Sequence, residues 1–150
     1  MLILQQILIR MISITRYQDI SAGHRVVGHE NKCSQLHGHN FRVHFTVTAK
    51  KLDDIGRIID FSVIKAQLCH WLETNWDHRF LMYEADELRI PLQKIISEDI
   101  VSCPFNPTTE NMARYLCEVI GPQQLKGTGC QLIKCTIEET RKCSATYEIS

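Results

Sequence analysis

The sequence has 150 residues, enough for one domain with a hydrophobic core of its own. Lys and Arg together number 17, as do Asp and Glu, so the formal net charge is zero and no basic excess favours nucleic acid as a partner. The seven cysteines form no Cys-x-x-Cys pair, which argues against a disulfide framework and indicates reduced thiols in a cytoplasmic protein.

Residues 1–9 are mostly apolar, but two glutamines interrupt the run and an arginine follows it. The run is too short to span a bilayer, and it lacks the basic start and small-residue cleavage site of a signal peptide. We therefore expect no membrane partner. Residues 1–11 are interpreted as an N-terminal extension of a single domain over 1–150, with Met11 as an alternative start.

The N-terminal half of the chain is predicted to form strands. Alternating apolar and polar residues indicate a first strand at 12–17, with His24 near the end of its continuation, and a second over 37–49, with a polar loop over 28–36 between them. Two aspartates and a glycine within 53–56 indicate a hairpin turn. Residues 57–59 are then predicted to return as a short strand.

Two helices are predicted further along the chain. Asp60 is the expected N-cap of the first, which continues to about Asn75. Thr108 is the expected N-cap of the second, which is predicted to end at Gly121 and Pro122. Each helix has an apolar stripe at helical spacing: Phe61, Ile64, Leu68 and Leu72 in the first, and Met112, Leu116, Val119 and Ile120 in the second.

Between the two helices, 89–96 is expected to hold one or two helical turns and 100–102 an edge strand. The last segment is predicted to be a hairpin that turns at Arg141 and Lys142. One strand face would carry Ile133, Cys135, Ile137 and Glu139, and the return strand Cys143, Ala145, Tyr147 and Ile149. Paired strands with two helices predict an α+β domain on an antiparallel sheet.

Four of the seven histidines lie within residues 24–40. Side chains two apart on a strand share a face, so His37 and His39 are predicted to project together from the buried side of the 37–49 strand. Converging neutral imidazoles are ligands that Zn²⁺ prefers, and His24 is the best candidate for a third. Three histidines would leave one coordination position open for a substrate oxygen or water.

Cys33 lies four residues before His37, and its role stays open among a fourth zinc ligand, an incidental thiol and a catalytic thiolate. The other six cysteines are interpreted as small buried hydrophobic residues: Cys69, Cys103, Cys117, Cys130, Cys135 and Cys143. The remaining histidines, His29, His44 and His70, are expected on the surface.

Two further sets of side chains suggest chemistry. Asp77 and His78 can act as a carboxylate and imidazole unit if the chain turns there, or as a surface salt bridge. Glu139 is predicted on a buried strand face, where a carboxylate needs a partner such as a ligand with two N–H donors. Alternatively, the strand frays at Glu139 and its carboxylate is solvated, as expected for Glu138 on the opposite face.

The motifs together resemble the 6-pyruvoyltetrahydropterin synthase and 6-carboxytetrahydropterin synthase family over about residues 12–149. In chain order they are Ser21–His24, Cys33–Asn40, Ile59–Phe61, Asp77–His78, Pro107–Asn111 and Glu139–Thr140. The resemblance implies a tunnelling fold, in which an antiparallel sheet with two helices on one face forms a barrel by oligomerisation. Such enzymes are usually homohexamers built from two trimers, with active sites between subunits.

The resemblance also implies roles for individual residues. His24, His37 and His39 look like the zinc ligands, and Cys33 looks like the base that abstracts a proton. His78, supported by Asp77, looks like its relay partner. Glu139 looks like the carboxylate that holds the pterin ring, and it is often counted in the relay. Thr108, Thr109 and Glu110 are similar to residues near the pterin pocket, although capping explains Thr108 equally well.

The substrate implied is 7,8-dihydroneopterin triphosphate. The spacing Cys-x-x-x-His-x-His resembles the bacterial lyases that make 6-carboxytetrahydropterin in the queuosine route, with loss of triphosphate and acetaldehyde. Formation of 6-pyruvoyltetrahydropterin, another purine or pterin substrate, and a non-catalytic zinc-stabilised binding module are the alternatives. Gly23 replaces the commoner Ala or Ser, and 82–103 is longer than in compact members. No spacing argument selects the triphosphate-binding residues among Arg25, Lys32 and Arg42.

Overall fold

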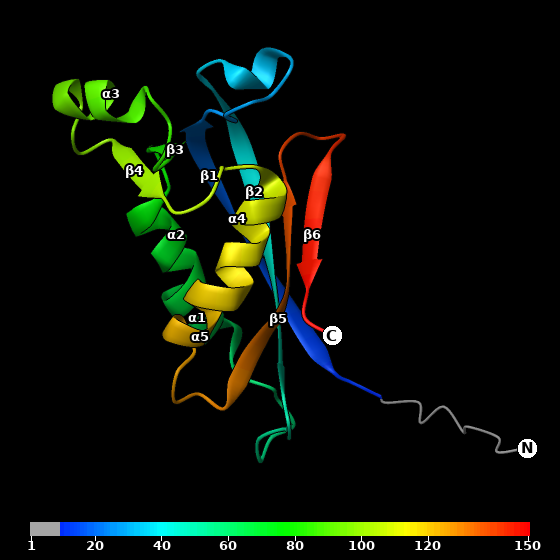
Figure 1. Cartoon of the computed structure of the whole chain (residues 1–150). Helices are drawn as coiled ribbons and strands as arrows, with labels where there is room; N and C mark the ends of the chain where they lie inside the picture. The colour runs from blue at the N-terminus through cyan, green and yellow to red at the C-terminus, as the bar shows by residue number, and fades with distance from the viewer. Residues whose placement is uncertain (1–9) are drawn as a thin grey trace, which may run out of the picture.

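The structure is a computed structural model in which residues 10–150 are described. Residues 1–9, and with them most of the predicted N-terminal extension, lie outside the described residues. Six strands form one sheet in the order β4-β3-β1-β2-β5-β6 (Figure 1). The strands are β1 Ser13–His24, β2 His37–Ala49, β3 Phe80–Tyr83, β4 Ile100–Cys103, β5 Cys130–Glu138 and β6 Ser144–Glu148.

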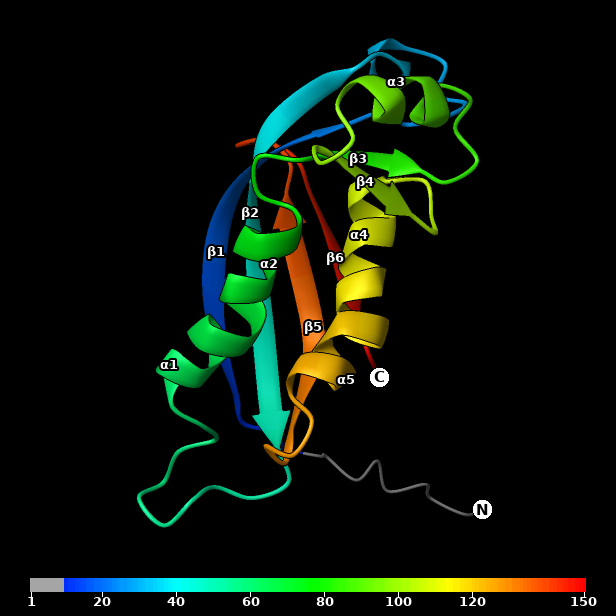
Figure 2. The same ribbon diagram turned by 90° about the vertical axis from the view of Figure 1, so that its left-hand side faces the viewer.

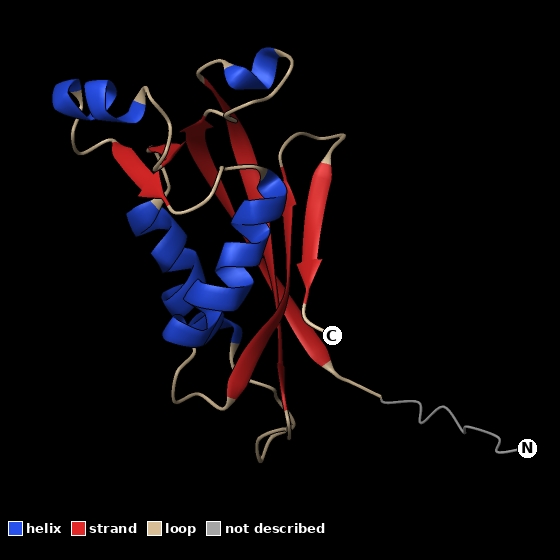
Figure 3. Ribbon diagram, in the orientation of Figure 1, coloured by secondary structure: helices blue, strands red, loops and turns tan. Residues whose placement is uncertain are grey.

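Two long helical segments lie on the same face of the sheet, as predicted (Figure 2 and Figure 3). Each contains a π-helical stretch between two α-helical parts. The first consists of α1 Phe61–Ile64, η2 Lys65–Cys69 and α2 His70–Asn75, and the second of α4 Thr109–Tyr115, η3 Leu116–Ile120 and α5 Gly121–Gln124. A short helix, α3 (Arg89–Ile95), follows β3, and a 3₁₀ turn, η1 (Lys32–Ser34), lies between β1 and β2. In the described part of the chain, no helix has the length and apolar character needed to cross a membrane.

Strand β2 is central, and its predicted alternation is confirmed. It pairs antiparallel with β1 on one side and with β5 on the other. The residues that follow the two histidines on the inward face are at most 1% exposed: Phe41, Val43, Phe45 and Val47. This strand therefore carries the inward histidines and much of the hydrophobic core on one face.

The predicted helix caps are also confirmed. Asp60 Oδ1 accepts a hydrogen bond from the Ser62 amide at 2.8 Å, and Thr108 Oγ1 accepts one from the Asn111 amide at 3.2 Å. These bonds satisfy amides that the first helical turn leaves free. Phe61 is 51% exposed, contrary to prediction, because it is the first helical residue and the buried stripe begins only at Ile64.

The prediction of a wholly antiparallel sheet is wrong at one edge. Strand β3 was not predicted, and it pairs parallel with the last two residues of β1 and with β4. A strand of four residues is too short for its alternation to be recognised among the charged residues that precede it. The sheet is therefore mixed, and its parallel part begins beside His24.

Two predicted boundaries are wrong as well. Residues 57–59 form no strand, because Arg57 pairs with Asp53 and closes the turn instead. The second helical segment does not end at Gly121 but continues to Gln124. A Cβ atom on Gly121 would lie 2.8 Å from Leu132 Cβ, so this glycine permits close packing of the helix on β5 rather than ending the helix.

The cysteines are free thiols throughout the described residues. Four of the six predicted to be buried are buried, and desolvation raises the pKa of Cys103 and of Cys117 to about 12, which keeps both thiols protonated. Cys130 is half-buried. Cys143 is exposed, contrary to prediction, because it lies in the turn between β5 and β6.

Candidate metal centre

The structure brings the three predicted histidines together at one end of the β1–β2 pair. His24 is the last residue of β1 and lies opposite His37, the first residue of β2. His39 follows on the same face of β2. With Glu139, just beyond the end of β5, these residues form a group of four whose ligand atoms all lie within 4.8 Å of one another. The backbone pairing of β1, β2 and β5 is therefore enough to bring this group together.

The hydrogen bonds of two of these rings define which nitrogen carries the proton. Nδ1 of His24 lies 2.8 Å from the carbonyl oxygen of Pro107, and Nδ1 of His37 lies 2.8 Å from that of Gln35. A carbonyl only accepts, so we assign the proton to Nδ1 in both rings. Both Nε2 atoms then present lone pairs, and they lie 3.0 Å apart. Two lone pairs cannot hydrogen-bond to each other, so the arrangement calls for a shared cation.

His39 and Glu139 complete the group. Oε1 of Glu139 lies 2.9 Å from Nε2 of His39 and 3.9 Å from Nε2 of His24. The contact with His39 has the distance of a hydrogen bond but not its direction, since this buried nitrogen makes no hydrogen bond within residues 10–150. The alternative of a frayed, solvated Glu139 does not fit these contacts.

Burial keeps two of the histidines in the neutral form that binds a metal. Desolvation lowers the pKa of His24 and of His39 below the ordinary histidine value, which favours neutral imidazoles at physiological pH. Three neutral imidazoles with a carboxylate nearby are a donor set typical of Zn²⁺. Nitrogen ligands at ~2.0–2.1 Å from one tetrahedral Zn²⁺ lie about 3.3 Å apart, close to the separation of the two Nε2 atoms. The residues present therefore fit a zinc ion.

Cys33 lies in η1, on the loop that joins β1 to β2, and its side chain is half-buried. Its backbone carbonyl accepts a hydrogen bond from the Val26 amide at 2.9 Å. Within the described residues the thiol is not a member of the four-residue group. A carboxylate, that of Glu139, rather than this thiol is the fourth member of the group.

The Asp77–His78 unit lies where the chain turns, as its chemistry requires. His78 has a φ of 58°, and its Nδ1 lies 3.0 Å from Asp77 Oδ2. The other carboxylate oxygen of Asp77 accepts from the Ser21 amide at 2.8 Å, which fixes the carboxylate on β1. The His78 side chain is 81% exposed. Its imidazole is therefore available to a group outside this chain.

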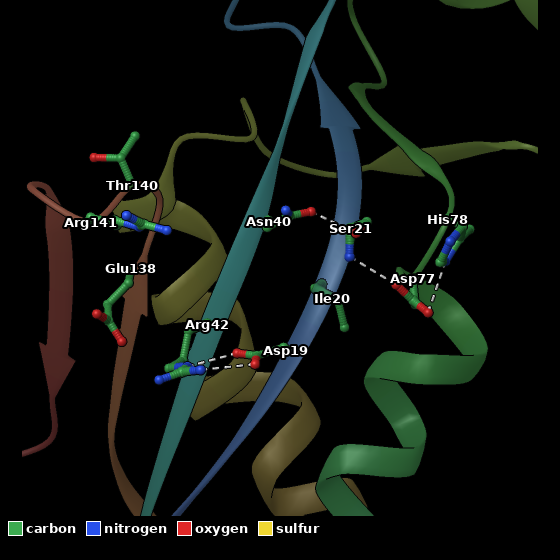
Figure 4. Close-up of a pocket in the computed structure, with 10 residues that line it drawn as sticks. All are labelled: Asp19, Ile20, Ser21, Asn40, Arg42, Asp77, His78, Glu138, Thr140 and Arg141. Carbon is green, nitrogen blue, oxygen red and sulfur yellow. Dashed lines mark hydrogen bonds and ion pairs between the residues drawn. The ribbon is translucent and has the colours of Figure 1, made fainter.

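Two hollows lie beside these residues, and His78 lines both. One of about 450 Å³ is lined by His37, His39 and His78, among others, but not by Cys33. The other, of about 530 Å³, is shown in Figure 4, where Asp77 and His78 lie at one side. Arg42 projects into this second hollow, but both ends of its guanidinium group bind Asp19, at 2.7 and 2.9 Å. This pairing leaves Arg42 poorly suited to bind a triphosphate.

The predicted substrate residues of the second helical segment lie at its start, directly after Pro107. Thr108 caps α4, Thr109 is buried and Glu110 is exposed in the first helical turn. The carbonyl of Pro107, the residue before the cap, is the acceptor for His24. The start of α4 is thus tied to a predicted metal ligand.

The remaining histidines are only partly as predicted. His70 is exposed, whereas His29 and His44 are half-buried. His44 Nε2 lies 2.5 Å from Glu138 Oε2 on the sheet face opposite the metal group. Glu138 is therefore on the predicted face but is paired rather than solvated.

Sequence reasoning missed the groups that orient the ligands. The carbonyls of Gln35 and Pro107 fix two imidazoles, and a backbone carbonyl leaves no signal in a sequence. Asn106, whose side chain exchanges two hydrogen bonds with the backbone of Val27, was also not predicted. Because Asn106 precedes Pro107, its sequence context predicts only that it lies in a turn.

Known proteins resemble this chain in both sequence and fold. Residues 13–150 match the family model described as 6-pyruvoyl tetrahydropterin synthase. A 6-carboxy-5,6,7,8-tetrahydropterin synthase from Rickettsia typhi is 35% identical over 134 residues, which are 89% of this chain and 97% of the relative. An uncharacterized protein from Wolinella succinogenes, 21% identical, matches the fold with a TM-score of 0.82 over 94% of this chain and 99% of its own. A 6-pyruvoyl tetrahydropterin synthase from Caenorhabditis elegans, 24% identical, matches with a TM-score of 0.67 over 94% and 97%.

Proposed function

Because the chain belongs to the 6-pyruvoyl tetrahydropterin synthase family, we propose that it converts 7,8-dihydroneopterin triphosphate to 6-carboxy-5,6,7,8-tetrahydropterin. The chain has the tunnelling fold of this family and is an enzyme of the lyase type. The proposed reaction releases triphosphate and acetaldehyde, and we place it in the queuosine route of the cytoplasm. The names of the curated relatives and the Cys-x-x-x-His-x-His spacing favour the carboxy product.

The observation that carries the proposal is the approach of the His24 and His37 Nε2 atoms to 3.0 Å, beside His39. In our proposal His24, His37 and His39 hold Zn²⁺. When bound, zinc would act as a Lewis acid toward hydroxyl oxygens of the substrate side chain and acidify the adjacent C–H bonds. The carbonyls of Gln35 and Pro107 hold two of the imidazoles in the tautomer that this task requires.

The chain's own side chains would move the proton and hold the ring. We assign proton abstraction to the thiolate of Cys33 and its return to His78, which Asp77 orients through the contact at 3.0 Å. Glu139 would accept from N–H donors of the pterin ring, with Thr108, Thr109 and Glu110 lining the pocket. The exposure of His78 supports a relay that acts across a subunit boundary. We therefore propose a homohexamer, built from two trimers, with active sites between subunits.

Incubation of the purified protein with 7,8-dihydroneopterin triphosphate, followed by mass spectrometry of the products, tests this function. We expect 6-carboxytetrahydropterin, triphosphate and acetaldehyde. Detection of 6-pyruvoyltetrahydropterin instead would change the product assignment but keep the reaction class. No conversion by the zinc-loaded protein would contradict the proposal as a whole.

One observation favours a different class of function. Three imidazoles and the Glu139 carboxylate supply four donors within 4.8 Å, enough to close a zinc site with no position left for substrate. In a non-catalytic, zinc-stabilised binding module of this kind, Asp77 and His78 would be incidental. The role of Glu139 therefore separates the two functions.

The Glu139→Gln variant is expected to keep its zinc and to bind a pterin about 10–100-fold more weakly, because hydrogen bonds to a charged group contribute about 1.5–3 kcal/mol. Zinc content by mass spectrometry and neopterin affinity by fluorescence quenching measure the two effects. Glu138→Gln is the matched control, since its carboxylate lies on the opposite face beside His44. Loss of zinc in the first variant would make Glu139 a ligand and favour the closed site. Glu110→Gln in the same assay shows whether a second carboxylate shares the task.

A further inference from the structure

Arg25, the residue after His24, joins two segments that are far apart in sequence. Its Nη1 atom lies 2.5 Å from Oδ1 of Asp86, and its Nε donates to the carbonyl of Ser34 at 2.8 Å. Asp86 belongs to the segment between β3 and α3, and Ser34 follows Cys33. Both α3 and the Cys33 loop lie at the end of the molecule where β1 ends (Figure 1). One guanidinium group therefore links the Cys33 loop to the segment that precedes α3.

Asp86 is an unusual residue to bury. The residue is only 4% exposed. Its Oδ1 also accepts a hydrogen bond from the Leu88 amide at 2.9 Å, so this oxygen has a structural role in the turn before α3. The other oxygen, Oδ2, has no hydrogen-bond partner among residues 10–150. Burial of a carboxylate is costly unless a countercharge is close. The turn alone needs only a neutral acceptor, so the negative charge serves the contact with Arg25.

Two hydrogen bonds join the Cys33 loop to the residues after β1, one at Cys33 itself and one at the next residue. The carbonyl of Cys33 accepts from the Val26 amide at 2.9 Å, and the carbonyl of the next residue accepts from the Arg25 side chain. The chain after β1 is also held at Val27, whose backbone exchanges two hydrogen bonds with the side chain of Asn106. The Cys33 loop is thus fastened to the residues that follow His24, and the Arg25 side chain links it in addition to Asp86, in the segment between β3 and α3.

We propose that the Arg25–Asp86 ion pair is a positioning device that holds the Cys33 loop in its working geometry at the metal group. The segment between β3 and α3 then influences the rate of proton transfer through Asp86 and Arg25. The effect on turnover rests on the proposed role of Cys33 in catalysis. The coupling between Asp86 and the loop is a property of the fold and can be measured separately.

The Asp86→Asn variant tests the device, because asparagine keeps the acceptor for the Leu88 amide and removes the charge that binds Arg25. We expect the amides of Ser34 and Gln35 to exchange hydrogen at least ~10-fold faster, as local opening becomes easier. Turnover is expected to fall about 10²-fold in kcat, the cost of a small misplacement of a reacting group, while KM and zinc content stay at wild-type values. Arg25→Lys should act in the same direction, since an ammonium group cannot bind Asp86 and the Ser34 carbonyl with the same fork.

Asp53→Asn is a closely matched control. Asp53 also accepts from an amide two residues ahead, that of Ile55, and also pairs with an arginine, Arg57, but in an exposed turn. This variant should leave exchange and kcat unchanged. Unchanged protection of the Cys33 loop in both Asp86→Asn and Arg25→Lys would overturn the proposal, as would faster exchange confined to α3. If the wild-type protein lacks synthase activity, the proposed function fails, while hydrogen exchange still decides whether the device exists.

Discussion

Replacement of His37 by alanine is expected to leave a folded protein that holds no zinc and makes no product. His37 supplies one of the two Nε2 lone pairs that face each other at 3.0 Å, and its removal leaves two imidazoles and a carboxylate. Loss of outer-sphere partners alone weakens metal affinity by about 10–100-fold, so the loss of a ligand should exceed that. Its side chain lies at the first residue of β2, outside the buried core. Zinc content after dialysis, circular dichroism and turnover measure the three effects.

His44→Ala is the control for this variant, because His44 lies on the same strand but faces Glu138 on the other side of the sheet. It should retain about one zinc per chain, the content expected of a single three-histidine site. Retention of zinc by His37→Ala would refute the ligand assignment. Loss of the fold along with the zinc would mean that the metal supports the structure rather than the reaction.

Replacement of Cys33 by alanine is expected to lower turnover by about 10²–10⁴-fold, the usual contribution of a general acid or base, and to leave zinc content unchanged. The expectation follows from the group of four, in which a carboxylate and not this thiol accompanies the histidines. Single-turnover kinetics with 7,8-dihydroneopterin triphosphate separates the chemical step from product release.

Cys143→Ala provides the comparison, since Cys143 is an exposed thiol in the turn between β5 and β6. It should keep full activity. Full activity of the Cys33→Ala variant would show that the thiol has no role in catalysis. Loss of zinc from this variant would instead support the alternative in which Cys33 is a fourth zinc ligand. Either result would remove the proposed proton transfer.

The parts of the fold that the sequence predicts well are those with long, regular patterns. The alternation in 37–49 defines both the bounds of β2 and its inward face. His37 and His39 lie on that face, so the same pattern predicts their position. The caps at Asp60 and Thr108 are local hydrogen bonds, so local sequence suffices for them. The grouping of the three histidines follows from strand patterns of the same local kind.

The parts that the sequence does not predict depend on distant contacts. Strand β3 owes its conformation to pairing with the end of β1, more than fifty residues earlier in the chain. Gly121 looks like a helix terminator until Leu132 is seen packed against it. The ion pair between Arg25 and Asp86 spans 61 residues, whereas the sequence alone leaves Arg25 among the candidate triphosphate ligands. Such contacts have no sequence spacing from which they could be inferred.

The pairing of His24 with His37 also bears on the order of folding. These residues are partners at the closed end of the β1–β2 ladder, so only residues 25–36 separate them, and closing this loop costs less entropy than pairing with the distant β5. Pairings that are local in sequence form faster than distant ones. We expect the three imidazoles to meet as soon as this hairpin forms, before β5 brings in Glu139 from about a hundred residues further along the chain. A nascent chain would then offer a nitrogen-only metal site first, and the carboxylate would arrive last.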